Sequence, residues 1–447
     1  MTAHLLERAW VDLGPGPAWH DDVVVEVEDG RFTHVEPECP AALAQRVPGL
    51  TVPGFANAHS HVFHRALRGR TQRERGSFWT WREQMYAVAE RLDPDSLFAL
   101  ARAAYREMVA AGFTTVGEFH YVHHRPDGSS YDDPNELGRA VVAAAREAGL
   151  RIALLDTCYL SAGFGAPPEG VQRRFTDGDA DRWAERRAAL TEEDGVVVGA
   201  AIHSVRAVPR DQLATVVAAA AGRPLHVHLS EQVAENDACL AAHGVTPTRL
   251  LADAGAIGPL TTAVHATHLT SEDIELLGDA AAHACFCPTT ERDLGDGIGP
   301  SRDLHEAGAR LTIGTDSHAV VDPFEELRAV ELDERLATQK RGHWSAAELL
   351  EAGTTTGHAS LGFPDAGRIA VGARADLVTL DPHSPRTAGT GHDEGTVVFA
   401  ATAADVTRVM VDGRVVVGQG GSIGSGAEET GRELDRAVRA LTETAAR

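Results

Sequence analysis

The chain has 447 residues, of which 43% are hydrophobic and 24% are charged, a balance typical of a folded protein with a large core. Asp and Glu outnumber Lys and Arg by 65 to 41, which gives a formal net charge of −24. Because so negative a surface repels phosphate groups, the composition argues against nucleic acids and anionic membranes as partners.

The two ends of the chain are rich in short β-strand patterns. β-Branched residues fill 23–27, and Asp-Gly dipeptides typical of hairpin turns occur at 29–30 and 412–413. An amphipathic helix is predicted over 431–447, because its apolar residues recur at helical spacing. We therefore expect both ends to form one small composite β domain, sandwich-like and including this helix, from residues 1–51 and 366–447.

The middle of the chain, residues 52–365, alternates apolar strand patterns with Ala-rich helical patterns. Uninterrupted apolar strands between helices are typical of a parallel sheet that is buried on both faces. Eight such strands favour closure into a (β/α)8 barrel of the TIM type, an α/β fold. The expected strands are 50–61, 113–121, 151–159, 196–204, 224–231, 261–269, 281–289 and 310–318.

The sequence has no pattern typical of export or of membrane insertion. Glu7 and Arg8 interrupt the segment in which the apolar part of a signal peptide would lie. No run reaches the ~18 apolar residues that a membrane helix needs. The five cysteines are an odd number in a long chain, which disfavours a secreted disulfide-linked fold. We therefore expect a cytoplasmic protein.

Side chains of the metal-ligand type end four of the predicted strands. In an extended segment, residues i and i+2 point to the same side, so the two histidines of a His-Ser-His run can reach one metal ion. The carboxyl ends of parallel strands meet at one rim of a barrel, so the whole set should lie together. Alone, the His-Ser-His run would favour two solvated loop histidines, but the joint position of the whole set favours a divalent ion such as zinc or iron. The set is His59, His61, His228, His265 and Asp316.

The chain resembles the amidohydrolase superfamily in PGFANAHSH (53–61), in GARADLVTLD (372–381) and over almost its whole length. The resemblance implies that His265 lies beside the metal-bound water. It implies as metal ligands His59, His61, His228 and Asp316. Members with two metal ions bridge them with a carboxylated lysine of the barrel, whereas the only lysine here is Lys340, beyond the eighth strand. We therefore expect one divalent ion per chain, zinc first, with iron or manganese also compatible.

Glu231 follows His228 by three residues. In similar deaminases of the superfamily, the glutamate of a His-x-x-Glu turn moves protons between water and the substrate nitrogen. A carboxylate beside the metal can take a proton from water and give it to a leaving amine. The same position begins the next predicted helix, where the helix dipole favours a carboxylate, and the two roles are compatible. Asp316 is the other carboxylate that can accept the first proton.

Six further segments resemble the N-formimino-L-glutamate deiminases of histidine breakdown. The resemblance implies metal-assisted hydrolysis of N-formimino-L-glutamate to N-formyl-L-glutamate and ammonia, with His265 orienting the nucleophile or stabilising the tetrahedral centre. It also implies a homodimer. The segments are WTWREQMY (79–86), EFHYVHH (118–124), HSVRAV (203–208), HVHLSEQ (226–232), HATHLT (265–270) and CPTTERDLGDGIGP (287–300).

The substrate of that family is a small anionic amidine with two carboxylates, and a chain of net charge −24 needs local arginines to hold it. Arg82, in the loop after the first strand, and Arg206, beyond the fourth, are suitable because guanidinium binds carboxylate through two parallel bonds. By resemblance, Tyr121 and His203 also line the pocket. The family commonly has a glutamine where this chain has His64, whose charge can vary with pH, so this substrate contact is the one departure.

Three alternatives remain open at this point. Another deaminase of the superfamily, acting on a nucleobase or another amidine, would favour aromatic stacking and would have little need of Arg82 and Arg206. Imidazolonepropionase-like ring hydrolysis uses the same scaffold. A non-catalytic barrel used for assembly would be expected to lack metal ligands, whereas the complete set is present here.

Overall fold

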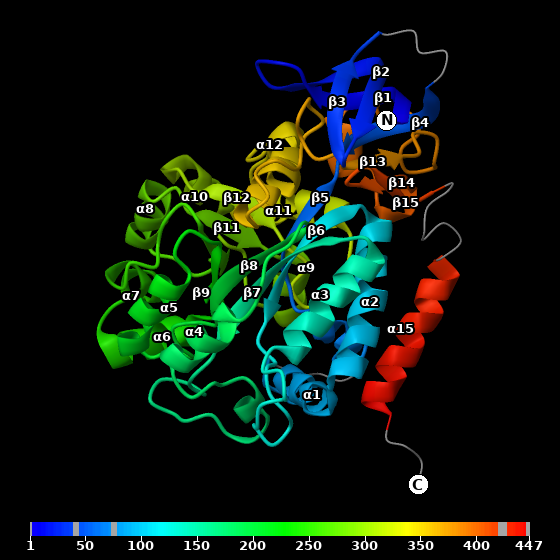
Figure 1. Cartoon of the computed structure of the whole chain (residues 1–447). Coiled ribbons are helices and arrows are strands. Elements are labelled where there is room, and N and C mark those ends of the chain that lie inside the picture. Colours follow the sequence, from blue (N-terminus) through cyan, green and yellow to red (C-terminus); the bar gives the residue numbers. More distant parts are fainter. Residues whose placement is uncertain (1, 39–43, 73–77, 419–426, 444–447) are drawn as a thin grey trace.

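The computed structural model describes residues 2–38, 44–72, 78–418 and 427–443. Cys39 and the last residues of the predicted C-terminal helix lie outside these ranges. Within them, eight parallel strands form one sheet in sequential order, from β5 to β12, and the sheet rolls into a barrel (Figure 1). The predicted (β/α)8 fold is confirmed. The strands are β5 (Phe55–Ser60), β6 (Phe113–His120), β7 (Arg151–Cys158), β8 (Val196–Ile202), β9 (Leu225–Leu229), β10 (Thr261–His265), β11 (His283–Phe286) and β12 (Arg310–Ile313).

The barrel closes where the end of β5 meets the segment after β12. The carbonyl oxygen of His59 accepts the N–H groups of Thr315 and Asp316 at 3.1 and 3.0 Å, and the N–H of His61 donates to the carbonyl of Asp316 at 3.1 Å. Gly314 makes this approach possible, because a Cβ atom there would lie 2.8 Å from the Cβ of His59. Closure of the barrel therefore joins two segments that both carry predicted metal ligands.

Helices cover the outside of the barrel (Figure 1). The α2 helix shows why its residues are helical: Asp93 and Ser96 form a capping box, Pro94 occupies the first turn, and Gly112 ends the helix with a φ of 108°. The α helices are α1 (Phe78–Arg91), α2 (Pro94–Ala111), α3 (Glu136–Ala148), α4 (Ala180–Ala188), α5 (Leu213–Ala219), α6 (Val233–His243), α7 (Pro247–Asp253), α8 (Ser271–Asp279), α9 (Pro288–Leu294), α10 (Ser301–Ala307), α11 (Pro323–Thr338), α12 (Ala346–Glu351), α13 (Gly357–Ser360), α14 (Glu394–Phe399) and α15 (Ala427–Thr442).

A second sheet, built from both ends of the chain, lies beside the barrel (Figure 1). In the described residues its order is β15-β14-β13-β4-β1-β2-β3, and all neighbours are antiparallel except β1 and β4. The chain passes from this sheet to the barrel at Gly54, between β4 and β5. The strands are β1 (Thr2–Asp12), β2 (Pro17–Glu28), β3 (Arg31–Glu36), β4 (Gln45–Pro53), β13 (Leu377–Leu380), β14 (Val406–Val411) and β15 (Arg414–Val417).

The C-terminal helix α15 lies along α2, on the outside of the barrel (Figure 1). Glu433 of α15 pairs with Arg102 and Arg106 of α2, and the carbonyl of Leu441 accepts a hydrogen bond from Arg91. Helix α15 is thus attached to the outside of the barrel through α2 and the end of α1. None of the helices in the described part of the chain combines the length and the apolar character that a membrane crossing needs.

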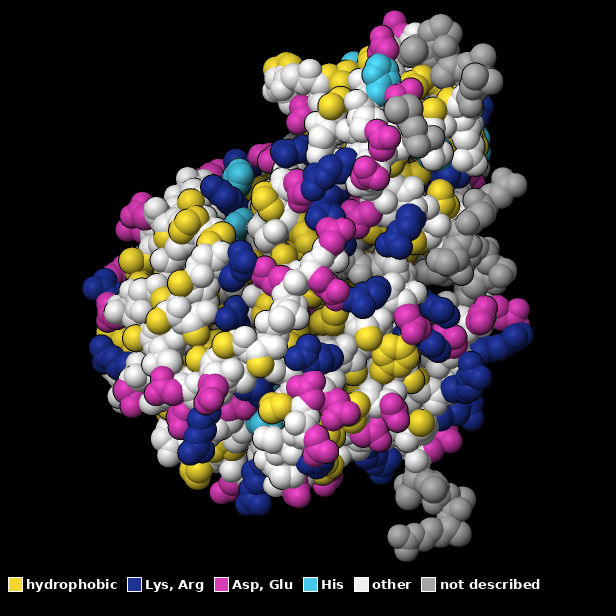
Figure 2. All heavy atoms as spheres, viewed as in Figure 1, with side chains coloured by type: hydrophobic (Ala, Val, Ile, Leu, Met, Phe, Trp, Pro, Cys, Tyr) yellow, Lys and Arg dark blue, Asp and Glu magenta, His cyan; other side chains and the backbone are white. Residues whose placement is uncertain are grey.

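Charged side chains are mixed on the surface. In Figure 2, acidic and basic groups lie side by side over the barrel and the small sheet, and the same face shows scattered apolar side chains. On this face the excess negative charge of the chain is therefore spread out, with basic groups interspersed among the acidic ones.

One buried ion pair joins the barrel to the small sheet. Arg151, the first residue of β7, donates to the carboxylate of Asp376 beside β13 and to that of Asp412 at 2.9 Å, in the predicted Asp-Gly turn. The side chains of Arg151 and Asp376 are 2% and 1% exposed. A charge this deeply buried depends on its partner, because removal of one member leaves the other without compensation.

We expect Arg151→Met to lower the free energy of unfolding by about 3–5 kcal/mol, since it leaves Asp376 buried and unpaired. The control is Arg249→Met, which removes an exposed pair with Asp253 and should cost no more than about 1 kcal/mol. The thermal midpoints of both variants check the prediction. Equal midpoints for the two variants would contradict it.

Candidate metal centre and active site

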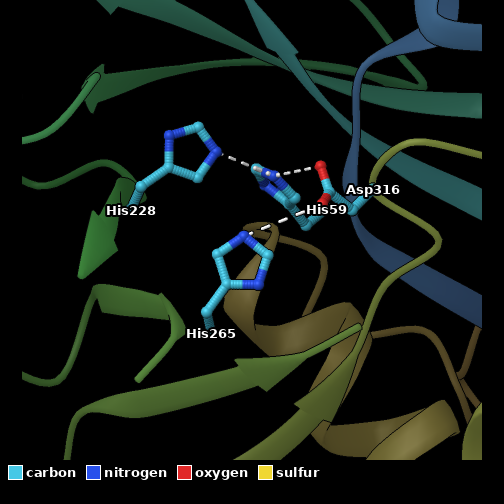
Figure 3. A group of neighbouring side chains, drawn as sticks. All are labelled: His59, His228, His265 and Asp316. Atoms are coloured by element: carbon cyan, nitrogen blue, oxygen red, sulfur yellow. Dashed lines mark hydrogen bonds and ion pairs between the residues drawn. The ribbon is translucent and has the colours of Figure 1, made fainter. Parts of the chain in front are cut away.

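The strand ends bring the predicted metal-site residues together at one rim of the barrel, including His265, which was predicted to lie beside the metal ligands. His59 is in β5, His265 ends β10, His228 is in β9 and Asp316 follows β12. Figure 3 shows that these four side chains point toward one common centre, and their ligand atoms all lie within 4.8 Å of one another. His61 belongs to the same cluster, because its Nε2 lies 3.2 Å from that of His228.

The hydrogen bonds of these histidines fix which ring nitrogen faces the centre. The Nδ1–H of His61 donates to the carbonyl of Phe119 at 3.0 Å, and the Nδ1–H of His228 donates to the carbonyl of His203 at 2.8 Å. Burial lowers the pKa of His61 to about 3 and that of His228 well below its usual value, so both rings are neutral. Their Nε2 lone pairs therefore face each other with no proton between them. A cation placed between the two nitrogens removes the repulsion between these lone pairs.

The spacing of the ligand atoms also suits a metal ion. The Nε2 atom of His228 lies 3.2 Å from those of His59 and His61, and both of these lie 3.4 Å from Oδ1 of Asp316. Tetrahedral zinc with bonds of about 2.0–2.1 Å holds its ligands about 3.3–3.4 Å apart. Three histidines and one aspartate thus fit a single divalent ion.

His265 is set apart from this group by its carboxylate neighbours. Its Nε2 lies 3.7 Å from Oδ2 of Asp316 and 4.0 Å from Glu231, and its Nδ1 lies 3.2 Å from Glu291. Burial alone would lower its pKa, but the charges of Glu231, Glu291 and Asp316 outweigh burial and raise the pKa well above the usual value. His265 is therefore held as a proton donor beside the cluster, in contrast to the neutral His61 and His228.

Asp316 stays ionised in this setting. Burial would raise its pKa, but the hydrogen bond from His59 and the charges of His265 and the other histidines lower it below the usual value. Its Oδ1 faces His59 and His61, and its Oδ2 faces His265. Asp316 thus contacts His59 and His61 through one carboxylate oxygen and His265 through the other.

The backbone at this rim is strained. Ser230, His265 and Asp316 have φ values of 50°, 69° and 40°, a left-handed conformation that side chains other than glycine rarely adopt. Each follows or ends a barrel strand, and each turn redirects the chain so that a functional side chain faces the centre. Strain of this kind persists only where the surrounding structure imposes it, and it is typical of active sites.

A cavity of about 740 Å³, including its mouth, opens beside the ligand cluster. All five predicted substrate contacts line it, together with Glu231, His265 and Asp316. The contacts are His64, Arg82, Tyr121, His203 and Arg206.

Arg82 lies on helix α1 and not in the loop in which we expected it. The helix places Arg82 and Tyr86 on one face, and the Nε–H of Arg82 donates to the hydroxyl of Tyr86 at 2.6 Å. Buried Arg174 fastens this helix, because it donates to the carbonyls of Ala89 and Leu92 at the helix end. The sequence prediction missed the helix because Gly- and Arg-rich residues precede it.

Arg206 faces the cavity next to a buried carboxylate. Its Nε lies 3.6 Å from Glu235 of α6, whose side chain is 1% exposed. Burial raises the pKa of Glu235 above its usual value, and nearby Glu231 adds to this effect. Arg206 therefore lies between protein carboxylates and the open cavity.

His64 is neutral, which removes the pH dependence that its residue type suggests. Burial, and then the neighbouring His61, lower its pKa well below the usual value. Its Nε2 lies 3.0 Å from the hydroxyl of Tyr121, and both residues line the cavity. At this position the chain thus presents a neutral ring that pairs with Tyr121.

Several functional residues escaped the sequence analysis. Glu291, Tyr86, Tyr159 and Gln172 all contact residues of the site, yet no spacing rule connects them to it. The family-like segments were one available signal, since Glu291 lies within 287–300 and Tyr86 within 79–86. Tyr159 ends the predicted strand 151–159 and so could have been placed at the rim, whereas Gln172 carried no signal.

Comparison with known proteins gives the family. A sequence profile described as the amidohydrolase family matches residues 50–416, most of the chain. The chain belongs to the amidohydrolase family. It is 40% identical to a formimidoylglutamate deiminase of Pseudomonas aeruginosa over 94% of this chain and 95% of that protein. It is 32% identical to a 5-methylthioadenosine/S-adenosylhomocysteine deaminase of Halobacterium salinarum, over 82% and 81% of the two chains.

A solved structure supports the same relationship. The crystal structure of an amidohydrolase from Brucella melitensis superimposes with a TM-score of 0.90 at 32% identity and covers 99% of this chain and 100% of that one. The similarity therefore includes the small sheet as well as the barrel of this amidohydrolase.

We expect His228→Ala to lose at least ten-fold in affinity for Zn²⁺, because it removes one of the four atoms that surround the centre. His226→Ala is the matched control, since His226 is also buried on β9 but bonds to the carbonyl of Ser360 away from the cavity. Calorimetric titration of both metal-free variants with zinc measures the difference. An unchanged zinc affinity in His228→Ala would overturn the assignment.

Proposed function

We propose that this amidohydrolase hydrolyses N-formimino-L-glutamate to N-formyl-L-glutamate and ammonia. The observation that carries the proposal is one cavity that joins a metal-ligand cluster to two arginines, Arg82 and Arg206. The 40% identity to a formimidoylglutamate deiminase over nearly all of both chains supports the choice of substrate.

We propose one Zn²⁺ per chain, held by the four atoms whose spacing suits it, with Fe²⁺ as the other compatible ion. The residues are His59, His61, His228 and Asp316. When bound, such an ion lowers the pKa of a water molecule and supplies a nucleophile near neutral pH. The homodimer and the cytoplasmic location expected from the sequence stay predictions.

The chain's own residues supply the proton transfers. The carboxylates of Glu231 and Asp316 lie 4.0 and 3.7 Å from the same atom of His265, its Nε2, so both carboxylates can reach a water molecule placed there. Water adds to the formimidoyl carbon, the bond from this carbon to the terminal nitrogen breaks, and the nitrogen leaves as ammonia. In this proposal Glu231 carries both water protons to the terminal nitrogen, the first as the oxygen adds to the carbon and the second as the carbonyl forms and the C–N bond breaks. His265 donates a hydrogen bond to the developing oxygen.

The substrate carboxylates find their counter-charges in Arg82 and Arg206. Local guanidinium groups are needed because the net charge of the chain, −24, repels a dianion. Tyr121 and His203 add neutral contacts, and His64 acts through its bond with Tyr121. A nucleobase would use the aromatic rings of the cavity but has no carboxylate to bring to the two guanidinium groups that line it, so we favour the dicarboxylate.

We expect Glu231→Gln to reduce kcat for N-formimino-L-glutamate by about 10²–10⁴-fold, because glutamine keeps the shape but cannot carry a proton between water and nitrogen. Zinc content should be unchanged, since Glu231 is outside the proposed ligand set. Ammonia release, with N-formyl-L-glutamate identified as co-product, measures the effect in zinc-loaded protein.

Exposed Glu272→Gln is the matched control and should keep wild-type activity, because Glu272 pairs only with Arg249 at the surface of the described structure. Near-normal turnover by zinc-loaded Glu231→Gln would contradict the role of Glu231. Absence of ammonia from the zinc-loaded wild-type protein would contradict the proposed substrate.

A further inference from the structure

Gln172 has an orientation that its hydrogen bonds determine completely. It lies in the short 3-10 helix Gly170–Arg174, and its Oε1 accepts the backbone N–H of Glu169 at 3.1 Å. The amide nitrogen must therefore point the other way, where it donates to the hydroxyls of Tyr86 at 3.0 Å and Tyr159 at 2.9 Å. Its side chain is buried, and both tyrosines line the cavity.

These bonds decide which way the two hydroxyl protons point. The oxygen of Tyr86 receives N–H groups from both Gln172 and Arg82, which fills its two lone pairs. The oxygen of Tyr159 also receives an N–H from Gln172. Neither Gln172 nor Arg82 offers these hydroxyls an acceptor, because guanidinium has none and the amide oxygen is engaged elsewhere. Neither neighbour takes the two phenolic protons, so both are available to an acceptor in the cavity that the two tyrosines line.

The surroundings keep these groups in place and protonated. Phe175, directly after the 3-10 helix, packs against Tyr86 and Tyr159 with ring centroids 6.3 and 5.4 Å apart. Burial raises the pKa of Tyr159 above its usual value, so its proton is retained. Arg82 and Arg206 are both close enough to act electrostatically on Tyr159. This wall of the cavity therefore combines positive charge with hydroxyl donors.

We propose that Tyr86 and Tyr159, oriented by Gln172, donate two hydrogen bonds to one carboxylate of the substrate and so complete the anion subsite that Arg82 and Arg206 begin. This inference rests on the proposed function and identifies specificity-determining residues for it. A carboxylate accepts every donor of the subsite, whereas a carboxamide in the same place turns its own N–H groups toward donors. The subsite therefore rejects the amide analogue of the substrate.

The decisive variant is Gln172→Glu, which keeps the size of the side chain but replaces the donor with an acceptor. The two hydroxyls then donate to residue 172 instead of the substrate. We expect KM for N-formimino-L-glutamate to rise at least ten-fold and kcat to change by less than three-fold. The double variant Tyr86→Phe/Tyr159→Phe should raise KM similarly, while Tyr131→Phe, outside the cavity, should leave both constants unchanged.

Substrate analogues add a readout that a merely structural role would not change. Wild-type protein should prefer N-formimino-L-glutamate over the analogue in which one carboxylate is an amide, and Gln172→Glu should reduce this preference at least ten-fold for one of the two mono-amides. Unchanged KM and unchanged preference in both variants would overturn the proposal.

Glutarate separates failure of the subsite from failure of the proposed function. Calorimetry measures its binding to zinc-loaded protein without any turnover. If the wild type releases no ammonia but binds glutarate, and both variants lose at least ten-fold in affinity, the subsite stands and the substrate assignment falls. If the wild type is active and the variants bind glutarate as tightly as it does, the subsite falls alone.

Discussion

The site depends on the closure of the barrel between β5 and the segment after β12. Main-chain hydrogen bonds join His59 and His61 to Thr315 and Asp316, and Gly314 allows the two backbones to approach. Without this closure, the histidines of the first strand and the aspartate after the last strand would be separated by the whole barrel. The fold thus creates the ligand cluster at the point where the sheet becomes a cylinder.

The ligand atoms of the cluster are held in an arrangement that favours the binding of a cation. The Nδ1–H bonds of His61 and His228 turn unprotonated nitrogens toward each other, and the left-handed φ of Asp316 directs its carboxylate to the same centre. The strain of the left-handed residues persists because the surrounding barrel imposes it. Hydrogen bonds and backbone turns thus hold these side chains toward one centre, and such fixed orientation is the condition for electrostatic catalysis.

The sequence predicts the barrel and the ligand cluster well because both follow from periodic patterns. Apolar strands identify the eight barrel strands, and the position of a histidine at a strand end determines the rim on which it lies. The helix that carries Arg82 was not predicted, although Arg82 bonds to Tyr86 only four residues away. Gln172 was not recognised because its role depends on a hydrogen bond to Tyr86, which lies 86 residues away in the chain. The direction of a tyrosine proton follows from its donors in three dimensions, and no sequence spacing encodes it.

The cavity has one end with His265 and Glu231, where we propose that the reaction takes place, and another with Arg82 and Arg206, where we propose that the anion binds. We propose that this second end selects a dicarboxylate amidine over 5-methylthioadenosine, which a less similar relative is named for. The most direct measurement is kcat/KM of the zinc-loaded protein for N-formimino-L-glutamate and for 5-methylthioadenosine in parallel. We expect a preference of at least about 10³-fold for the former, because a purine has no carboxylate to bind the two guanidinium groups of the cavity. Equal or faster deamination of 5-methylthioadenosine would contradict it.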